Sequence, residues 1–597
     1  MKNLIIIEKN SLFINFILFF FSKKNTLIYY FHPYQIDQYK KFINKIKRFQ
    51  EFTLPHETEQ SITYKANKEA LKILDEKNTE KIANFFTNIG IPKEILIAFR
   101  KYQLIQISYQ IRIAHILDYI NSQISYEFKI YCFMSNRFDF KYSKEFQKSK
   151  KNIIFYNINI VSLFSRMWIT IISLFYIPFF IILKILKNGL NFSQVVPKRY
   201  KFGFHFNNNV FNRNTYANKN SFTVSRSDFY LSKMLNYKDN ESIYIYSHWN
   251  FNSEEKKRNI KEIRSRGAHL GYEYDNPINL IVLKITFKYY FNLLKLITKQ
   301  VYTNDMSFLD LITINRIIRD LVICEIFCSN YKIDNFISRD DYSPIHISRT
   351  ITFNKYNLNN NGIAHSCCQE NHTTMTLSYT YFKTYFTQGH FYYEDVHKKN
   401  WFSKNHISIG PIYSPLIEDS LKDKKKHDKF IEEYGNKKKI CYLIGAFNSE
   451  ECPFDSRSVN LDSQNKLLDL MKLDSEIIIF IVPRNKNSVE ELLQSFDQYE
   501  KYKDRIFIDF FYSTYDLMAY CNYLITEATS SSIFEGTANP ELSIIPFNSR
   551  TITVNPLYNY KNIKVFETTF EIYNEIKNQI SNEEKFIINN TSIKKLI

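Results

Sequence analysis

The sequence predicts an α/β protein with two Rossmann-like αβα domains that face a cleft. Short apolar strands alternate with helical segments along the chain, and its 597 residues are too many for one ordinary core. A charged stretch at 418–439 separates two such alternations, and exposed linkers of this kind mark domain boundaries. The apolar run 477–482 (IIIFIV) is typical of a strand buried on both faces of a parallel sheet.

These patterns predict an N-terminal domain over residues 1–415 and a C-terminal domain over residues 416–597 that ends in a polar tail. Long helical patterns at 35–127 enlarge the first domain as a helical insertion. Before it, residues 3–7 (NLIII) and 26–31 (TLIYYF) read as strands that open a parallel sheet. A secretory signal is the alternative, but Glu8 interrupts the apolar run and no small-residue cleavage site follows, which favours a cytoplasmic strand.

A hydrophobic segment at 160–187 is expected to associate with a membrane. Residues 167–183 carry no charge, which is near the lower limit for a span of about 20 residues, and Pro178 would kink a helix there. A buried helix, a monotopic membrane helix and a true span all remain open. We expect a helix that docks on or dips into the cytoplasmic leaflet, because lysines beside it attract anionic lipid.

The composition limits the classes of partner that the chain is expected to bind. With 45% hydrophobic and 23% charged residues the chain is globular rather than disordered. A net charge of +19 favours nucleic acid, an anionic membrane face or an anionic substrate. Since there is no arginine-rich arm and no nucleic-acid motif, we expect no nucleic-acid partner. The eight cysteines form no CxxC pair and are expected to be buried thiols in a reducing compartment, so no metal site is expected.

The stretch 505–539 carries the main candidate site. A strand (YLIT) leads through a small polar turn, Thr529 to Ser532, into a helix that contains Glu535. Backbone N–H groups at such a turn suit the phosphates of a nucleotide, and Glu535 would accept hydrogen bonds from a ribose diol. The alternative is that Ser530, Ser531 and Ser532 merely cap a buried helix.

Further candidates follow other predicted strands. Gly445 lies at the end of the strand predicted at 440–447 (ICYLIGAF), where lack of bulk lets a ligand approach, and Arg484 follows the strand at 477–482. Asp340 and His365 follow the strands at 335–338 and 362–364, and ligands of open parallel sheets bind beyond the carboxyl ends of strands. For Asp340 the alternative is a cap on the next helix.

Several motifs, in this order, carry a resemblance. They are ISRDDYSP, GIAHS, HFYYED followed by ISIGP, IIIFIVPRNKN and LITEATSSSIFEG, between residues 335 and 547. The chain resembles the GT-B-type glycosyltransferases of bacterial surface-carbohydrate assembly (capsule and lipopolysaccharide), including their Kdo- and sialic-acid-using branches. The resemblance implies that Ser530, Ser531, Ser532 and Glu535 bind the donor nucleotide. It also implies that Asp340 or His365 is the acceptor-side acid or base.

The chain departs from this family in one motif, which leaves the identity of the donor open. CMP-sugar users of this type often carry His-Pro after the strand where this chain has Val482-Pro483-Arg484, so the imidazole is absent. Arg484 would still neutralise a phosphate. The expected function is transfer of a sugar from a nucleotide-activated donor to a surface polysaccharide or lipid-linked acceptor, with inversion and without a metal or other cofactor. Hexosyl, Kdo and sialyl donors are not distinguished. The expected place is the cytoplasm, peripheral or monotopic at the inner membrane. The alternative is a non-catalytic, membrane-associated scaffold or glycan-binding protein with a degenerate GT-B fold.

Overall fold

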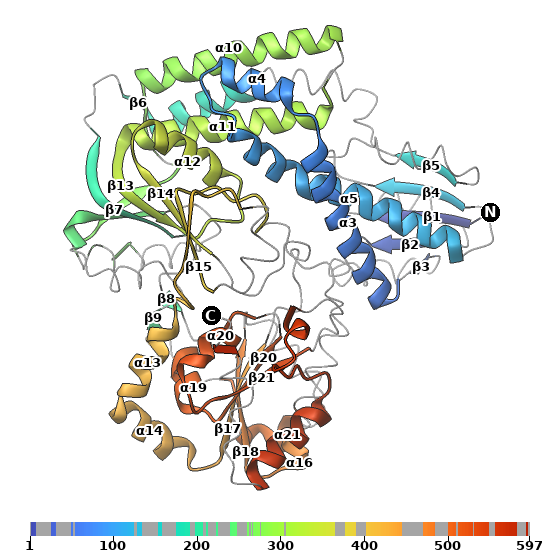
Figure 1. Ribbon diagram of the computed structural model, residues 1–597, viewed down its shortest axis with the longest axis vertical. Coiled ribbons are helices and arrows are strands. Elements are labelled where there is room, and N and C mark those ends of the chain that lie inside the picture. Colours follow the sequence, from blue (N-terminus) through green and yellow to red (C-terminus); the bar gives the residue numbers. More distant parts are fainter. Residues whose placement is uncertain are drawn as a thin grey trace.

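The computed structural model describes the chain in segments separated by gaps. The described residues are 2–7, 26–30, 49–51, 54–123, 128–133, 153–157, 175–191, 197–206, 211–212, 223–224, 239–246, 260–261, 264, 267–274, 276–303, 306–364, 377–389, 401–444, 468, 470–483, 499–508, 512–528, 530–548, 556–581 and 593–594. Three parallel sheets organise these residues, and we call them the N-terminal, the middle and the C-terminal sheet (Figure 1).

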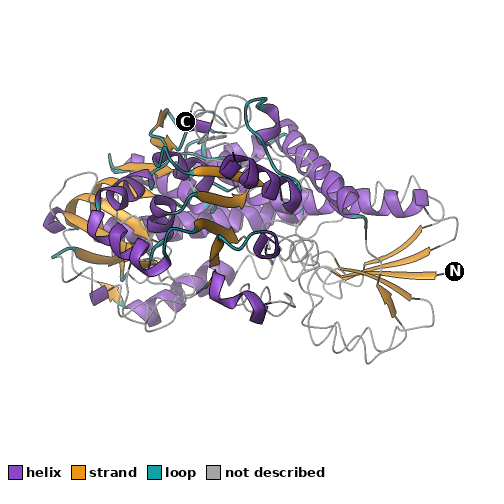
Figure 2. Ribbon diagram, turned by 90° about the horizontal axis from the view of Figure 1, so that it is seen from below, coloured by secondary structure: helices purple, strands orange, loops and turns teal. Residues whose placement is uncertain are grey.

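The N-terminal sheet has five parallel strands in the order β3-β2-β1-β4-β5. They are β1 (Lys2–Ile7), β2 (Thr26–Tyr30), β3 (Phe49–Glu51), β4 (Phe128–Phe133) and β5 (Ile153–Asn157). The strands expected at 3–7 and 26–31 are therefore present. They do not join the sheet that contains β13, as a single N-terminal Rossmann-like unit would require, and Figure 2 shows them standing to one side of the molecule.

Helices follow between β3 and β4, where long helical patterns were expected. They are α3 (His56–Glu76), α4 (Glu80–Asn88) and α5 (Ile95–Gln123). Their apolar faces join one large buried cluster that also contains residues of α10 (Leu280–Thr303) and α11 (Phe308–Asn330). These helices therefore connect the N-terminal sheet to the middle of the molecule.

The middle sheet has seven parallel strands in the order β11-β10-β7-β13-β14-β15-β16. They are β7 (Lys198–Phe206), β10 (Ser242–Tyr246), β11 (His269–Tyr272), β13 (Tyr331–Ser338), β14 (Asn359–Ile363), β15 (Thr384–Thr387) and β16 (Asn405–Ser408). Phe336 of β13 packs against Phe327 of α11 and Phe353 of α12 (Ile345–Lys355), so these two helices cover one face. Gly203 allows this packing, because a Cβ there would lie 2.7 Å from the Ile333 side chain.

Short elements complete the middle region. β6 (Leu190–Asn191) pairs in parallel with β12 (Ile278–Asn279), and β8 (Phe211–Asn212) pairs in antiparallel with β9 (Thr223–Val224). A 3₁₀ turn, η2 (Asp239–Glu241), precedes β10. Within the hydrophobic segment, residues 175–188 are helical. Among the helices of the described residues, none has the length and apolar character to cross a bilayer.

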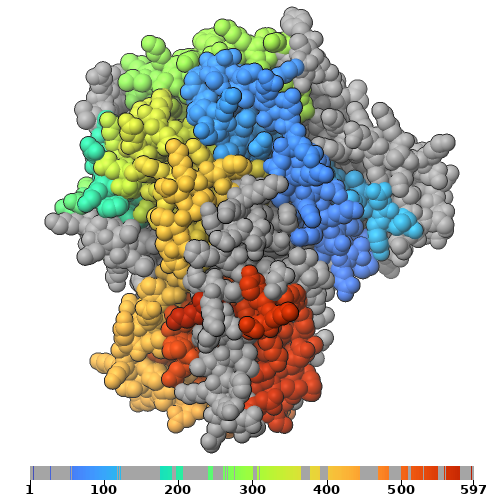
Figure 3. All heavy atoms as spheres, viewed as in Figure 1, coloured from blue at the N-terminus to red at the C-terminus, as the bar shows by residue number. Residues whose placement is uncertain are grey.

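The C-terminal sheet has five parallel strands in the order β19-β18-β17-β20-β21. They are β17 (Lys438–Ile444), β18 (Ile477–Pro483), β19 (Ile506–Phe507), β20 (Tyr523–Glu527) and β21 (Ser543–Phe547). The helices and 3₁₀ turns of this region are α13 (Ser414–Lys422), α14 (Lys424–Tyr434), α16 (Leu470–Leu473), α18 (Tyr499–Tyr502), η6 (Lys503–Arg505), α19 (Thr514–Tyr520), α20 (Ser532–Glu535), η7 (Gly536–Ala538), η8 (Pro556–Asn559) and α21 (Thr569–Ser581). Figure 3 shows the segment 401–434 running down one face from the middle region onto this body.

The predicted α/β class is confirmed by the middle and C-terminal sheets, which are both parallel and interleaved with helices. When the strands of each sheet are numbered by their order in the chain, all three sheets begin with the spatial order 3-2-1-4-5, so the first strand is an interior strand of its sheet. Successive strands therefore run outward from the first strand in one direction and then in the other. The change of direction creates a topological switch point, where open α/β sheets bind ligands beyond the carboxyl ends.

Candidate functional site

The carboxyl edges of the middle and C-terminal sheets meet at one junction. Arg339, which directly follows β13, donates a hydrogen bond to the hydroxyl of Tyr413, and its guanidinium lies 5.4 Å from that ring. The Tyr413 ring lies 5.9 Å from the ring of Tyr515, which opens α19 after β19. Residues that follow β13 in the middle sheet and β19 in the C-terminal sheet therefore meet at one junction.

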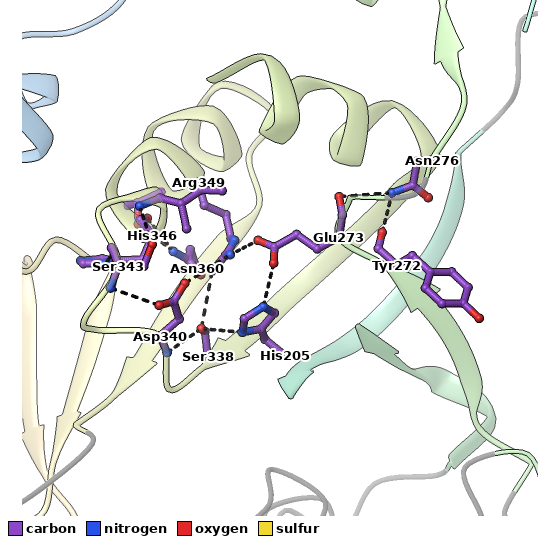
Figure 4. Close-up of polar contacts among 12 residues, drawn as sticks. His205, Tyr272, Glu273, Asn276, Ser338, Asp340, Ser343, His346, Arg349 and Asn360 are labelled. Atoms are coloured by element: carbon purple, nitrogen blue, oxygen red, sulfur yellow. Dashed lines mark hydrogen bonds and ion pairs between the residues drawn. The ribbon is translucent and has the colours of Figure 1, made fainter. Parts of the chain in front are cut away.

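A cluster of ionisable side chains lies at the switch point of the middle sheet, between β7 and β13. His205 comes from β7, Glu273 follows β11, and Arg349 projects from α12. Glu273 lies between the other two: its Oε2 is 2.9 Å from His205 Nε2, and its Oε1 accepts a hydrogen bond from Arg349 (Figure 4). Burial raises the pKa of Glu273, but Arg349 and His205 outweigh it and hold that pKa at about 2. Glu273 is therefore a fixed negative charge.

Asp340 completes the cluster on the side nearest to solvent. Its carboxylate lies 3.8 Å from Arg349, and its side chain is 10% exposed, against 2% to 5% for His205, Glu273 and Arg349. Burial raises the pKa of Asp340, while Arg349 and His205 oppose that rise. A carboxylate with a raised pKa is better matched to proton transfer near neutral pH than an ordinary one.

Ser338 ties the cluster to the end of β13. Its Oγ lies 3.4 Å from His205 Nδ1 and accepts hydrogen bonds from the Asp340 amide at 3.0 Å and from Arg349 at 3.5 Å. Asp340 also accepts a hydrogen bond from the Ser343 amide at 3.2 Å. The helix cap considered from the sequence is not formed, because the N-cap of α12 is Pro344 and no side chain caps that helix. Asp340 instead binds the loop before α12, and its second carboxylate oxygen lies 3.8 Å from Arg349.

Asp341, beside Asp340, belongs to a different set of contacts. Its Oδ2 accepts a 2.8 Å hydrogen bond from the Tyr385 hydroxyl, and its backbone oxygen accepts one from Lys101 of α5 at 2.7 Å. Lys101 also donates to the Ser378 backbone oxygen at 2.8 Å. Burial lowers the pKa of Lys101 to about 7, although Asp341 and Asp340 oppose the change. Through Lys101, helix α5 supports the loop that carries Asp340.

His346 is a structural histidine. Its Nδ1 donates to the Ser343 backbone oxygen at 2.5 Å, its Nε2 accepts from the Tyr381 amide at 3.3 Å, and its ring stacks on Phe382 at 4.5 Å. Burial holds the pKa of His346 well below its ordinary value. Both ring nitrogens are occupied by the backbone, so His346 is not available for catalysis.

The switch point of the C-terminal sheet lies between β17 and β20, and the serine-rich turn follows β20 directly. Ser530 and Ser531 are half-buried there, whereas Ser532 and Glu535 are buried. Ser530 N donates to Glu527 O at 2.8 Å, and Ser532 N donates to Ser530 Oγ at 3.3 Å. Helix α20 spans only Ser532–Glu535 before it tightens into a 3₁₀ turn, so its dipole is short. The assignment of this turn to a donor nucleotide stays a prediction.

The remaining predicted site residues lie outside the described residues. His365 comes two residues after the end of β14, Gly445 directly follows β17, Arg484 directly follows β18, and Thr529 precedes Ser530. Their roles stay predictions. In the sequence, each of the four comes one or two residues after the last residue of a described strand.

The cysteine expectation is confirmed for the cysteines whose side chains the structure describes. Cys324, Cys328, Cys441 and Cys521 are free and buried. Among the described residues no group of three His, Cys, Asp or Glu side chains is arranged to hold a metal ion. A hollow of about 600 Å³ lies between α3 and α5, lined by His115 and Asp118 among others, and no predicted site residue lines it.

Sequence reasoning missed His205, Glu273, Arg349 and Lys101 as site residues. A usable signal existed for His205, since an imidazole near the carboxyl end of the apolar strand KFGFHF is unusual in a buried strand. Glu273 follows an edge strand, and nothing in the sequence places it beside His205. Only the strand order brings them together.

Comparisons with known proteins reveal distant structural similarities. No family model matches the chain, and no curated protein matches it. Among solved structures, the chain is similar to the wall teichoic acid polymerase TagF at 10% identity and a TM-score of 0.38, covering 72% of this chain and 92% of that one. The UDP-GlcNAc 2-epimerase from Neisseria meningitidis bound to UDP-GlcNAc has 10% identity and a TM-score of 0.37, covering 67% and 95%. MurG from Acinetobacter baumannii has 9% identity and a TM-score of 0.32, covering 67% and 95%.

Proposed function

We propose that the chain is a glycosyltransferase that moves a sugar from a nucleotide-activated donor to a surface glycan or lipid-linked acceptor at the cytoplasmic face of the inner membrane. The observation that supports this most is the position of Asp340. It lies at the switch point of the middle sheet, beside the junction with the C-terminal sheet, and it is the most exposed member of its charged cluster. The resemblance of the sequence motifs points to the same class.

In the proposed reaction, Asp340 takes the proton of the acceptor hydroxyl. The hydroxyl oxygen attacks the anomeric carbon from the face opposite the nucleotide, and the bond from that carbon to the phosphate oxygen breaks, which inverts the configuration. Arg484 and the turn at Ser530 to Ser532 would stabilise the negative charge of the departing nucleotide. Arg349 and Glu273 touch neither substrate in this scheme and are positioning residues.

A non-catalytic scaffold or glycan-binding protein is the second candidate. One observation favours it: His205, Glu273 and Arg349 are nearly completely buried and bind one another, as in a structural ion-pair network. Such networks also perturb pKa values without any catalytic role.

A panel of nucleotide sugars separates the two candidates. A ligand that binds only the folded protein raises its melting temperature, so UDP-, GDP-, CMP- and dTDP-sugars are screened by thermal shift, and stabilising donors are then assayed for hydrolysis and transfer. The transferase predicts stabilisation by at least one donor, with turnover that Asp340→Asn removes while stabilisation persists. Stabilisation without turnover would favour the scaffold, and no stabilisation by any donor would overturn the nucleotide-sugar proposal.

A further inference from the structure

Helix 175–188 presents an apolar face to the outside. Phe175, Phe179, Ile182, Leu183 and Leu186 recur at the helical spacing and are between 48% and 77% exposed. On the opposite side, Ile177 and Ile181 are buried in the large cluster that contains α11. The exposed face is therefore a continuous stripe rather than scattered surface residues.

Helix α10, which the sequence analysis did not single out, presents a second apolar face. Leu280, Ile281, Phe287 and Phe291 are between 49% and 60% exposed, and the rings of Phe287 and Phe291 stack 6.3 Å apart. Figure 1 shows α10 at the outer edge of the molecule, beyond α11. Exposed apolar patches of this extent on a folded protein mark interaction surfaces.

The two faces belong to neighbouring helices. Strand β6 begins two residues after helix 175–188 ends, β12 leads directly into α10, and the two strands pair in parallel with Leu190 opposite Ile278. Ile177 and Ile181 of the first helix share their buried cluster with Val282 of α10. The C-terminal end of helix 175–188 therefore lies near the N-terminal end of α10.

The charge on these helices has one sign. Every charged side chain on them is a lysine: Lys184, Lys187, Lys284, Lys288, Lys295 and Lys299. Two copies of the chain that met through this surface would bring lysine against lysine, with no carboxylate on either helix to neutralise them. Anionic lipid headgroups, in contrast, complement lysines that flank an apolar face.

From this we infer that the exposed faces of helix 175–188 and α10 together form one docking surface for an anionic lipid bilayer, with both helices in the plane of the interface. The sequence predicted a membrane-associating segment at 160–187 only. The surface adds a second helix, α10, which begins more than ninety residues later in the chain. The inference does not rest on the proposed transfer reaction, since lipid binding needs neither donor nor acceptor.

The docking surface is connected to the candidate site by direct packing. Phe180 of helix 175–188 packs, half-buried, against a small cluster that contains Ile345, the first residue of the helix that carries Arg349. A bilayer bound at this surface would thus have a defined orientation relative to the middle sheet.

Vesicle flotation of the full chain tests the inference, with vesicles of phosphatidylcholine alone or mixed equally with phosphatidylglycerol. The wild-type chain should bind the anionic vesicles, and more weakly as salt rises. The double variant Phe287→Ser/Phe291→Ser should lower the partition coefficient about tenfold or more, because two large apolar side chains no longer enter the interface. Lys284→Glu/Lys288→Glu should lower it to a similar extent on anionic vesicles only.

Phe570→Ser is the matched control, because Phe570 is 68% exposed on α21 of the C-terminal body and its loss should leave vesicle binding unchanged. All substituted residues are exposed, so thermal unfolding should confirm that each variant is folded. Unchanged vesicle binding by both α10 variants would overturn the inference. A change of oligomeric state in the Phe287/Phe291 variant, without any lipid dependence, would also overturn it and assign the face to contacts between copies.

Discussion

The middle and C-terminal sheets share a strand order but place different chemistry at their carboxyl edges. Between β7 and β13 the middle sheet holds His205, Glu273, Arg349 and Asp340 within hydrogen-bond or ion-pair distance of one another. Between β17 and β20 the C-terminal sheet is followed by a turn of small hydroxyl side chains. One edge carries full charges held in place by burial, and the other carries hydroxyl and backbone groups.

This difference fits a division of labour. Proton transfer needs an ionisable group with a perturbed pKa, which burial and charged neighbours provide at the middle sheet. Phosphate binding needs donors without a competing negative charge, which a serine-rich turn provides. The N-terminal sheet has the same strand order, so topology alone does not determine which sheet carries a site.

The largest expected effect comes from removing the charge of Asp340. We expect Asp340→Asn to reduce the rate of sugar transfer by about 10²- to 10⁴-fold, the range typical of a lost general base, while the fold persists. Single-turnover assays with a donor identified by thermal shift would measure it.

Glu325→Gln is the matched control. Glu325 is also buried and ion-paired, more deeply than Asp340, and it binds Lys355 at 2.7 Å and the Tyr356 hydroxyl at 2.6 Å. It lies on α11 five residues before that helix ends and β13 begins, at the amino edge of the same sheet. It should lower stability and leave the rate unchanged. Equal losses of rate in both variants would mean that the charged cluster serves stability alone.

The second effect is on stability. Arg349→Met would leave the Glu273 and Asp340 carboxylates without their buried guanidinium, at a cost of about 3–5 kcal/mol in the free energy of unfolding. Lys426→Met is the counterpart in the C-terminal body, where Lys426 binds Asp516 at 2.7 Å but is 31% exposed, so we expect about 1 kcal/mol. Urea unfolding followed by tryptophan fluorescence and by circular dichroism would measure both. If both variants lost a similar amount of free energy of unfolding, the buried ion pairs of the middle region would contribute no more to stability than the half-exposed pair of the C-terminal body.

The third effect is a pH dependence caused by Lys101. Its pKa is lowered to about 7 in the folded state by burial, against an ordinary value near 10.5, so between these values the unfolded chain binds more protons. The free energy of unfolding should therefore rise with pH through this window, by about 2 kcal/mol between pH 7 and pH 9 from Lys101 alone. We expect Lys101→Met to flatten that rise. A parallel pH profile for wild type and variant would show that Lys101 is not deprotonated in the folded protein.

The strands of the C-terminal sheet could be predicted because their signal is local. The run 477–482 (IIIFIV) is apolar throughout, as buried parallel strands require, and the run 523–526 (YLIT) carries Leu and Ile between Tyr and Thr. A charged residue, Arg484 or Glu527, comes within two residues of the end of each run. The same reasoning placed Asp340 at a carboxyl edge. It predicted both the α/β class and the strand that directly precedes the loop carrying Asp340.

The separate N-terminal sheet could not be predicted in this way, because strand pairing is a long-range property. The residues of β1 specify an extended, apolar segment, but they do not specify that its partners are β2 and β4 rather than β7. The contact between His205 and Glu273 is hidden for the same reason, since β8, β9, η2, β10 and β11 lie between them along the chain.

The smallest expected effect is at the serine-rich turn. We expect Ser531→Ala to weaken nucleotide binding by about three- to tenfold, because one hydrogen bond contributes about 0.5–1.5 kcal/mol and the backbone donors of the turn remain. Titration calorimetry with the nucleotide found by thermal shift would measure the change. Ser420→Ala is the control, since Ser420 is a half-buried serine of α13 whose hydroxyl donates to Asp516 at 2.8 Å, and it should leave affinity unchanged. If Ser531→Ala and Glu535→Ala both bind the nucleotide as wild type does, the carboxyl edge of the C-terminal sheet is not the donor site. The proposed assignment of phosphate binding to this edge would then be wrong.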